Sequence, residues 1–201
     1  MQIALPEMNV AATLILDGER PPSDEQFLAF CEANRDLRIE RSAKGEICIV
    51  PPAGYESDSR NEEVTVQLGN WSRRTKRGRT SGSSTLFRLP DGSALSPDAA
   101  WVSNERRAAL PREAGKGFLP LCPEFVIEVM SPADRLPAAQ QKMRNWIANG
   151  AELGWLIDGD GMRVYVFRQN GEVQIVTGDR IEGEGPVSGF TMDLTAIWAG
   201  A

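Results

Sequence analysis

Glu128 is the residue of this 201-residue chain whose position most strongly suggests chemistry. It lies in the run Phe125-Val126-Ile127-Glu128-Val129-Met130, which predicts a central strand that is otherwise apolar on both faces. A carboxylate in such a strand is costly unless it is paired, protonated or bound to a metal. Two interpretations follow: a structural ion pair with a buried arginine, or a metal ligand or acid–base group at the active edge of a sheet.

Two further residues could act with Glu128. Asp98 follows Ser96-Pro97 and precedes an apolar run, so it marks the start of a second strand, although an aspartate after proline is by itself an ordinary turn residue. Two carboxylates on adjacent strands, with a backbone carbonyl and water, would suit an octahedral Mg²⁺ site. Lys142 lies beside the apolar stripe of a predicted helix, where it either extends into solvent or orients water at the metal.

Histidine is absent from the sequence, which excludes whole classes of mechanism. Ser-His-Asp and Cys-His catalysis, His-based zinc sites and nucleases with a histidine base all need an imidazole. Cys31, Cys48 and Cys122 are widely spaced and form no C-x-x-C pair, which favours reduced thiols over a zinc ribbon or a disulfide framework. Hydrolysis would have to use carboxylates, lysine, hydroxyl groups or metal-bound water.

The densest basic run is unexpected in a chain of net charge −6. It comprises Arg73, Arg74, Lys76, Arg77 and Arg79. The run is either a solvated helix end, where cations suit the negative pole of the helix dipole, or a patch that contacts nucleic-acid phosphates. Overall acidity argues against a dedicated nucleic-acid-binding protein but not against a local basic groove.

Apolar spacing and turn signals predict the elements that must position these residues. Helices are expected at residues 24–34, after an S-x-x-Q capping box, at 60–77 and at 137–149. Strands are expected at 37–40, 46–50, 85–89, 98–102, 125–130, 155–157, 164–167 and 172–176. Gly45 and residues 90–92 supply turns, and residues 103–121 read as a long loop or short helix. This order predicts an α/β fold with one mixed sheet and helices on its faces.

Length and hydropathy set the expected organisation and location. A chain of this size predicts a single domain over residues 1–201. The apolar stretch from Val10 to Leu16 is too short to span a bilayer, and no basic segment precedes it as in a secretory signal. The sequence therefore predicts a cytoplasmic protein with no membrane segment.

Several short segments, taken in order, resemble the Uma-type restriction endonuclease family, which is similar to the PD-(D/E)xK nuclease superfamily. They are Leu37–Glu40, Arg60-Asn61, Ser96-Pro97-Asp98, Pro123–Pro132, Lys142-Met143, Asn149–Ala151 and Gly154–Asp158. None of them is specific alone. Their order and spacing make the resemblance, which spans a core of about residues 23–198 and so nearly the whole chain.

The resemblance implies a restriction-endonuclease-like mixed β-sheet flanked by α-helices, with a divalent-metal phosphodiesterase site. Asp98 and Glu128 match the family's two acids, which would bind Mg²⁺ or Mn²⁺, and Val129 matches the position whose carbonyl completes the metal shell. Glu40 matches a further acidic position near the start of the domain. Met130 replaces the superfamily's usual lysine, and Lys142 matches members in which that lysine has moved to the following helix.

The predicted function is therefore a metal-dependent endonuclease that hydrolyses phosphodiester bonds in DNA through metal-activated water. One alternative is an inactive nuclease-like fold that serves as a DNA-binding or protein-interaction module. Another is a glycosidase built on Glu124 and Glu128, but a separation of roughly 13 Å along a strand exceeds the range of that chemistry. Nucleic acid is the expected partner, and a homodimer is the simplest way to cut both strands. If Glu128 has no ionic partner, Glu128→Ala should abolish cleavage and leave the fold as stable or more stable.

Overall fold

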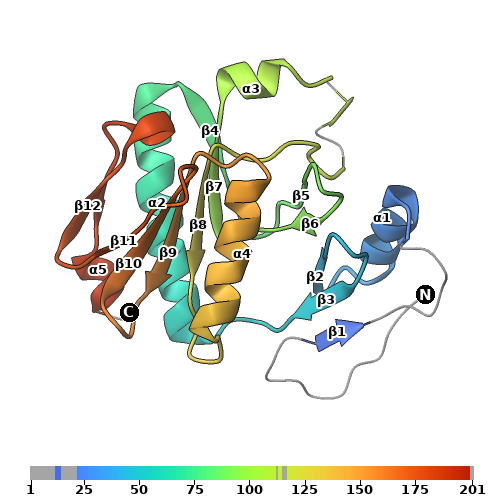
Figure 1. Cartoon of the computed structure of the whole chain (residues 1–201), viewed down its shortest axis with the longest axis horizontal. Coiled ribbons are helices and arrows are strands. Elements are labelled where there is room, and N and C mark those ends of the chain that lie inside the picture. Colours follow the sequence, from blue (N-terminus) through green and yellow to red (C-terminus); the bar gives the residue numbers. More distant parts are fainter. Residues whose placement is uncertain (1–11, 15–21, 112, 115–116, 200–201) are drawn as a thin grey trace. The chain divides into compact units, whose positions relative to one another are not determined.

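The computed structural model describes residues 12–14, 22–111, 113–114 and 117–199, which group into two compact units (Figure 1). The first unit comprises Met1–Pro52, Ser84–Ser96 and Arg112–Leu121, and the second comprises Ala53–Ser83, Pro97–Pro111 and Cys122–Ala201. A single domain over the whole chain stays a prediction. Most of the apolar stretch from residue 10 to 16 lies outside the described residues. Among those that are described, no helix has the length and hydropathy to cross a membrane.

The first unit packs one helix on an antiparallel five-stranded sheet of order β1-β3-β2-β6-β5. Its elements are β1 (Ala12–Leu14), α1 (Asp24–Ala33), β2 (Arg38–Arg41), β3 (Ile47–Val50), β5 (Phe87–Arg88) and β6 (Ala94–Leu95). The predicted capping box starts α1, and Gly45 turns the β2–β3 hairpin at a φ of 84°. Phe27 and Phe30 of α1 pack on Ile39, Ile47 and Ile49.

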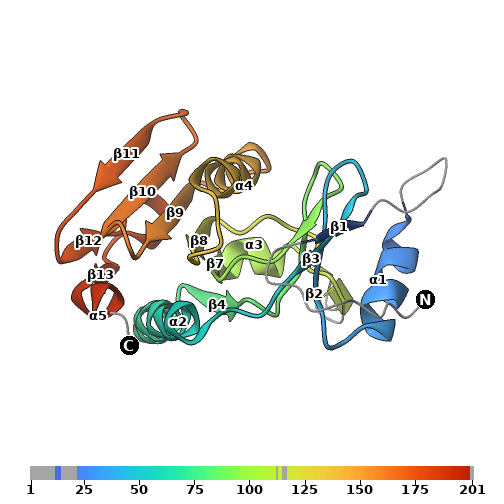
Figure 2. The ribbon, with the colours of Figure 1, turned by 90° about the horizontal axis from the view of Figure 1, so that it is seen from below.

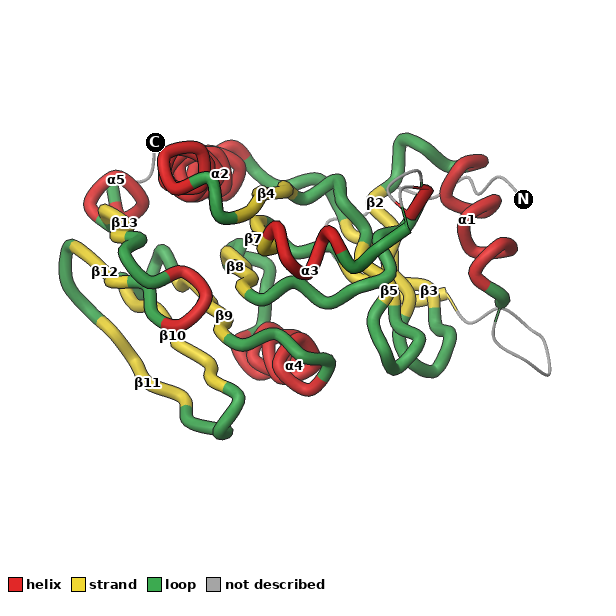
Figure 3. The backbone as a smooth tube through the Cα atoms, turned by 90° about the horizontal axis from the view of Figure 1, so that it is seen from above, coloured by secondary structure: helices red, strands yellow, loops and turns green. Residues whose placement is uncertain are grey.

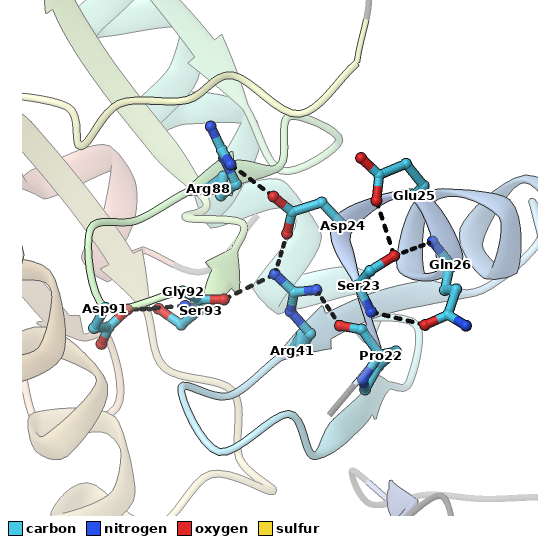
Figure 4. Close-up of polar contacts among 10 residues, drawn as sticks. All are labelled: Pro22, Ser23, Asp24, Glu25, Gln26, Arg41, Arg88, Asp91, Gly92 and Ser93. Atoms are coloured by element: carbon cyan, nitrogen blue, oxygen red, sulfur yellow. Dashed lines mark hydrogen bonds and ion pairs between the residues drawn. The ribbon is translucent and has the colours of Figure 1, made fainter. Parts of the chain in front are cut away.

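A buried arginine connects three segments of the first unit (Figure 4). The Arg41 guanidinium, on β2, donates to Asp24 Oδ1 at 2.6 Å, to the Gly92 carbonyl at 2.8 Å and to the Pro22 carbonyl at 3.1 Å. It also lies over the ring of Phe27, 4.9 Å from the centroid. Arg41 therefore joins the start of α1 and the β5–β6 turn to the sheet.

Asp24 makes the stability of the first unit dependent on pH. The hydrogen bond from Arg41, aided by one from Arg88, holds the pKa of the Asp24 carboxyl below its usual value. A lowered folded-state pKa contributes stability that is present above the unfolded-state pKa and is lost as the pH falls through the folded-state value. We expect Asp24→Asn to unfold at lower urea concentration than the wild type at pH 7, with a smaller difference below about pH 4. Urea titrations at the two pH values test this; an equal difference at both would contradict it.

The second unit is built on a six-stranded mixed sheet of order β11-β10-β9-β8-β7-β4, in which only β8 and β9 are parallel to each other. Its strands are β4 (Gly78–Gly82), β7 (Ala99–Ser103), β8 (Phe125–Val129), β9 (Leu153–Asp158), β10 (Arg163–Arg168) and β11 (Val173–Val176). In Figure 2 the central strands β8 and β7 lie between α4 and α2, and the sheet continues past α4 through β9 to β10 and β11. The predicted mixed sheet flanked by helices is confirmed.

The helices α2 (Tyr55–Thr75) and α4 (Leu136–Ala148) cover opposite faces of this sheet (Figure 3). Phe125, Ile127 and Val129 of β8 pack with α2 in the main core of the unit. Side chains alternate between the faces of a strand, so Glu128 lies on the face that α4 covers. The remaining elements are α3 (Asn104–Ala108), β12 (Arg180–Glu182), the 3₁₀ helix η2 (Gly185–Val187), β13 (Thr191–Asp193) and α5 (Thr195–Trp198).

The structure differs from the predicted elements at several places. The helix α2 begins at Tyr55, whereas the sequence predicted residue 60. The apolar spacing did not reveal the first turns, because they are polar and bury only Ser57 and Arg60. The turn at residues 90–92 joins β5 to β6, whereas β7 belongs to the sheet of the second unit. The strand β4 and the two-stranded β12–β13 sheet were not predicted, since Gly-Arg-Thr-Ser-Gly has little β-propensity. The strands consequently form three sheets rather than one.

Gly78, which directly follows the predicted helix of residues 60–77, is not the residue that ends α2. The residue that ends α2 in the left-handed region is Lys76, at a φ of 55°. A Cβ atom at Gly78 would lie 2.4 Å from the Val102 carbonyl oxygen and 2.5 Å from the Trp101 ring. Gly78 therefore lets the edge strand β4 approach β7 across the Trp101 indole.

Candidate active site

The Glu128 carboxylate is buried and is held by two side chains of α4. Lys142 Nζ lies 3.0 Å from Oε1 and 3.2 Å from Oε2, and Trp146 Nε1 donates to Oε1 at 2.9 Å. Glu128 is only 7% exposed. Its ionic partner is thus a lysine rather than a buried arginine. Glu128→Ala would leave the fold equally or more stable only if this charge were unpaired, and Lys142 pairs with it.

Helix geometry explains why two residues of α4 reach one carboxylate. Lys142 and Trp146 are one helical turn apart, and helical side chains at that spacing lie on one face and tilt toward the N-terminus. Pro137 stands in the first turn of α4, and Gly150 follows its end at a φ of 109°. The predicted helix of residues 137–149 is therefore close to the observed one.

Asp98 lies next to Glu128 by the register of their strands. In the β7–β8 ladder Ala99 is opposite Ile127 and Ala100 is opposite Val126, so continuing the ladder by one residue sets Asp98 opposite Glu128. Residues directly opposite in an antiparallel pair share a face, with Cβ atoms about 4.5–5.5 Å apart. Asp98 is 7% exposed, and its Oδ2 accepts the Val129 N–H at 2.8 Å.

The backbone carbonyl of Val129 faces the same side as Asp98. The Val129 N–H points to Asp98, whereas the next N–H along β8, that of Met130, donates to the Ile157 carbonyl beside β9. In an extended strand the N–H and C=O of one residue point to the same neighbour, so the Val129 C=O is directed toward the β7 side.

The chemistry of these groups fits a small hard cation. Two carboxylates and a carbonyl are oxygen donors of the kind that Mg²⁺ prefers, and Mg²⁺ commonly keeps several of its waters. Nowhere in the described ranges do three or more His, Cys, Asp or Glu side chains form a metal-binding group. The oxygen donors that could hold such a cation are the carboxylates of Asp98 and Glu128 and the Val129 carbonyl.

Two other acidic residues differ in their setting. Glu40 is buried on β2 of the first unit, where it accepts the Ser96 N–H at 3.1 Å. Glu124, the second carboxylate of the glycosidase alternative, is buried: it pairs with Arg106 Nε at 3.2 Å and accepts the Ser103 N–H. Glu124 is thus part of an ionic contact with α3.

The basic run is exposed but does not lie beside the carboxylates. Gly78, where β4 begins, pairs with Ser103 at the end of β7, whereas Asp98 precedes the beginning of β7. Arg79 is opposite Val102, four residues along the strand from Asp98 and so about 13 Å away. Arg77 is also engaged: it lies over the Trp71 ring and donates to the Ser188 carbonyl at 2.7 Å.

Sequence reasoning missed the contact of Trp146. Trp146 belongs to the apolar stripe of the predicted helix, with Ala139, Met143 and Ile147, and such a stripe is typical of ordinary core packing. Only the i, i+4 relation of Trp146 to Lys142 could have indicated a shared target. Gln141, next to Lys142 in the sequence, donates to Asn145 on the exposed side of α4.

The second unit, with a six-stranded mixed sheet and helices on both faces, has an α/β fold. It is similar to the "Crystal structure of a putative nuclease belonging to DUF820 from Anabaena variabilis ATCC 29413", with a TM-score of 0.68 and 19% identity over 80% of this chain and 89% of that one. Residues 24–195 match the model of the Uma2 family, described as "Putative restriction endonuclease". The chain belongs to this family.

Other comparisons add little. A DrdV–DNA complex solved by electron cryomicroscopy matches with a TM-score of 0.35 and 13% identity over 60% of this chain and 12% of that one, a likeness too low to support an argument. No curated protein matches the chain.

Proposed function

We propose that this protein is a divalent-metal-dependent endonuclease that hydrolyses phosphodiester bonds in DNA. The observation that carries the proposal is the β7–β8 register. Continued by one residue beyond the pair Ala99 and Ile127, this register sets Asp98 opposite the buried Glu128. Membership of a restriction endonuclease family supports the same reaction class. The Lys142 ammonium beside Glu128 supplies the cation that phosphodiester chemistry needs near its developing negative charge.

Asp98, Glu128 and the Val129 carbonyl would hold the Mg²⁺ or Mn²⁺ ion. When bound, that ion supplies an activated water and stabilises negative charge on the phosphate. Lys142 orients the attacking water or offsets charge on the phosphate, and it does so from a partly buried position where electrostatic effects are stronger than in bulk water. The role of Glu40, which belongs to the first unit, stays a prediction from the family resemblance.

A cleavage assay on DNA and RNA tests the proposal. We expect wild-type protein to cut DNA with Mg²⁺ or Mn²⁺ and not with EDTA, and Asp98→Asn to be inactive. Glu32→Gln, which removes an exposed carboxylate of α1, serves as the matched control and should retain activity. Metal-independent cleavage, or none with either metal, would overturn the proposal, and DNA binding without cleavage would favour a binding module.

The basic run is proposed to contact DNA phosphates. Each contacted phosphate contributes a slope of about −0.9 to the dependence of log affinity on log salt. We expect the double variant Arg73→Gln/Arg74→Gln to reduce the magnitude of that slope by up to about two units and to leave metal affinity unchanged. Arg77→Gln should change it less, because Ser188 and Trp71 engage that guanidinium.

Fluorescence anisotropy of labelled duplex DNA between low and moderate salt measures these slopes. Arg180→Gln, an exposed cation on β12, is the control and should behave like the wild type. Identical slopes for the Arg73/Arg74 variant and the wild type would assign the run to a solvated helix end.

Location and assembly complete the proposal. We propose that the protein acts in the cytoplasm, where its DNA substrate is present. Two copies acting together would cut both strands of a duplex. Sedimentation of the protein with and without duplex DNA measures whether such a homodimer forms.

A further inference from the structure

Trp146 holds one oxygen of Glu128 from inside the second unit. Its side chain is fully buried, with 0% exposure, and its indole N–H donates to Glu128 Oε1 at 2.9 Å. Lys142 Nζ approaches the same oxygen at 3.0 Å and Oε2 at 3.2 Å. Two donors on one carboxylate limit both its position and its rotation.

Packing alone does not require this hydrogen bond. Trp71 and Trp101 belong to the same unit and are as deeply buried, at 2% and 3% exposure. Across the part of the chain that the structure describes, their indole N–H groups have no hydrogen-bond partner. A buried tryptophan in this unit is thus tolerated without an acceptor, so the bond from Trp146 to Glu128 is a specific feature of the α4 face.

The two donors differ in charge, which separates their roles. A cation that binds Glu128 repels the Lys142 ammonium, whereas the indole N–H is neutral and can keep its bond to Oε1. Hydrogen-bond donors behind a metal-binding carboxylate orient that carboxylate, and losing one typically lowers metal affinity by about 10- to 100-fold.

We propose that Trp146 is a positioning residue: its indole N–H holds the Glu128 carboxylate in the orientation in which Glu128 binds the divalent cation. The inference rests on the proposed function, because it requires Glu128 to be a metal ligand. Trp146 acts through Glu128 and has no contact with substrate in this role.

Calorimetric titration of the full chain with Mn²⁺ tests the proposal without measuring catalysis. Trp146→Phe removes the donor but also some volume, so a second variant replaces Trp146 by β-(3-benzothienyl)alanine, which keeps the shape of the indole and lacks the N–H. We expect both to bind Mn²⁺ about 10- to 100-fold more weakly than the wild type. Trp101→Phe, which removes an indole N–H that has no hydrogen-bond partner, is the matched control and should bind Mn²⁺ like the wild type.

The outcomes separate the inference from the proposed function. Wild-type Mn²⁺ affinity in the benzothienylalanine protein, with an unchanged unfolding transition, overturns the positioning role and leaves the nuclease proposal standing. An equal loss of affinity in Trp101→Phe also overturns it, since the effect would then come from the core in general. Absence of Mn²⁺ binding to the wild type overturns both.

Discussion

Glu128→Gln is expected to lower metal-dependent cleavage by at least about 10²- to 10³-fold, the loss typical when one preorganised electrostatic group is removed. The amide oxygen can still accept the Trp146 N–H, but the side chain can no longer pair ionically with Lys142 or neutralise a divalent cation. Single-turnover cleavage of duplex DNA at saturating Mg²⁺ measures the loss. Glu63→Gln, on α2, is the control and should cleave like the wild type.

The stability of the same variant separates a catalytic role from a structural one. Lys142 is 26% exposed and can turn its ammonium into solvent, so Glu128→Gln should cost only about 1–3 kcal/mol of unfolding free energy. A folded, inactive protein fits the proposed role. Full activity in a destabilised protein would make Glu128 a structural partner of α4 only.

Arg106→Ala is expected to destabilise the protein by about 2–4 kcal/mol, the largest stability effect expected here. The Arg106 guanidinium pairs with Glu124 and Glu152 and donates to the Cys122 carbonyl at 2.7 Å. Because Glu124 is 5% exposed, losing its cation leaves a buried carboxylate without that charge partner. Urea unfolding of the whole chain measures the change.

Two further variants control this result. Arg107→Ala removes the neighbouring, exposed arginine of α3 and should change stability by less than about 0.5 kcal/mol. Adding Glu124→Gln to Arg106→Ala should recover part of the lost stability, because the buried charge is then gone. If Arg106→Ala were no more destabilising than Arg107→Ala, the Arg106–Glu124 pair would contribute little to the fold.

Local signals in the sequence were sufficient for the elements around the site. The Ser23–Gln26 capping box predicted α1, the apolar run at residues 125–130 predicted β8, and Pro137 and Gly150 delimited α4. These features are encoded within a few residues of one another, by backbone hydrogen bonding, proline and glycine conformation and side-chain period. They also suffice to single out Glu128, since a charged residue in a doubly apolar strand needs no tertiary information to be recognised.

Partners and sheet membership were decided by the tertiary structure. The β7–β8 register decides that Asp98 lies opposite Glu128. The face of the sheet that α4 covers decides that Lys142 and Trp146 contact this carboxylate. Tertiary structure also places β6 and β7 in different sheets. It sets the basic run near the end of β7 that is farther from Asp98. Sequence by itself determined which residues are chemically unusual here, because a charged side chain within an apolar run is recognisable locally. Strand register and helix packing join residues far apart in the chain, and they decided what each of these residues contacts.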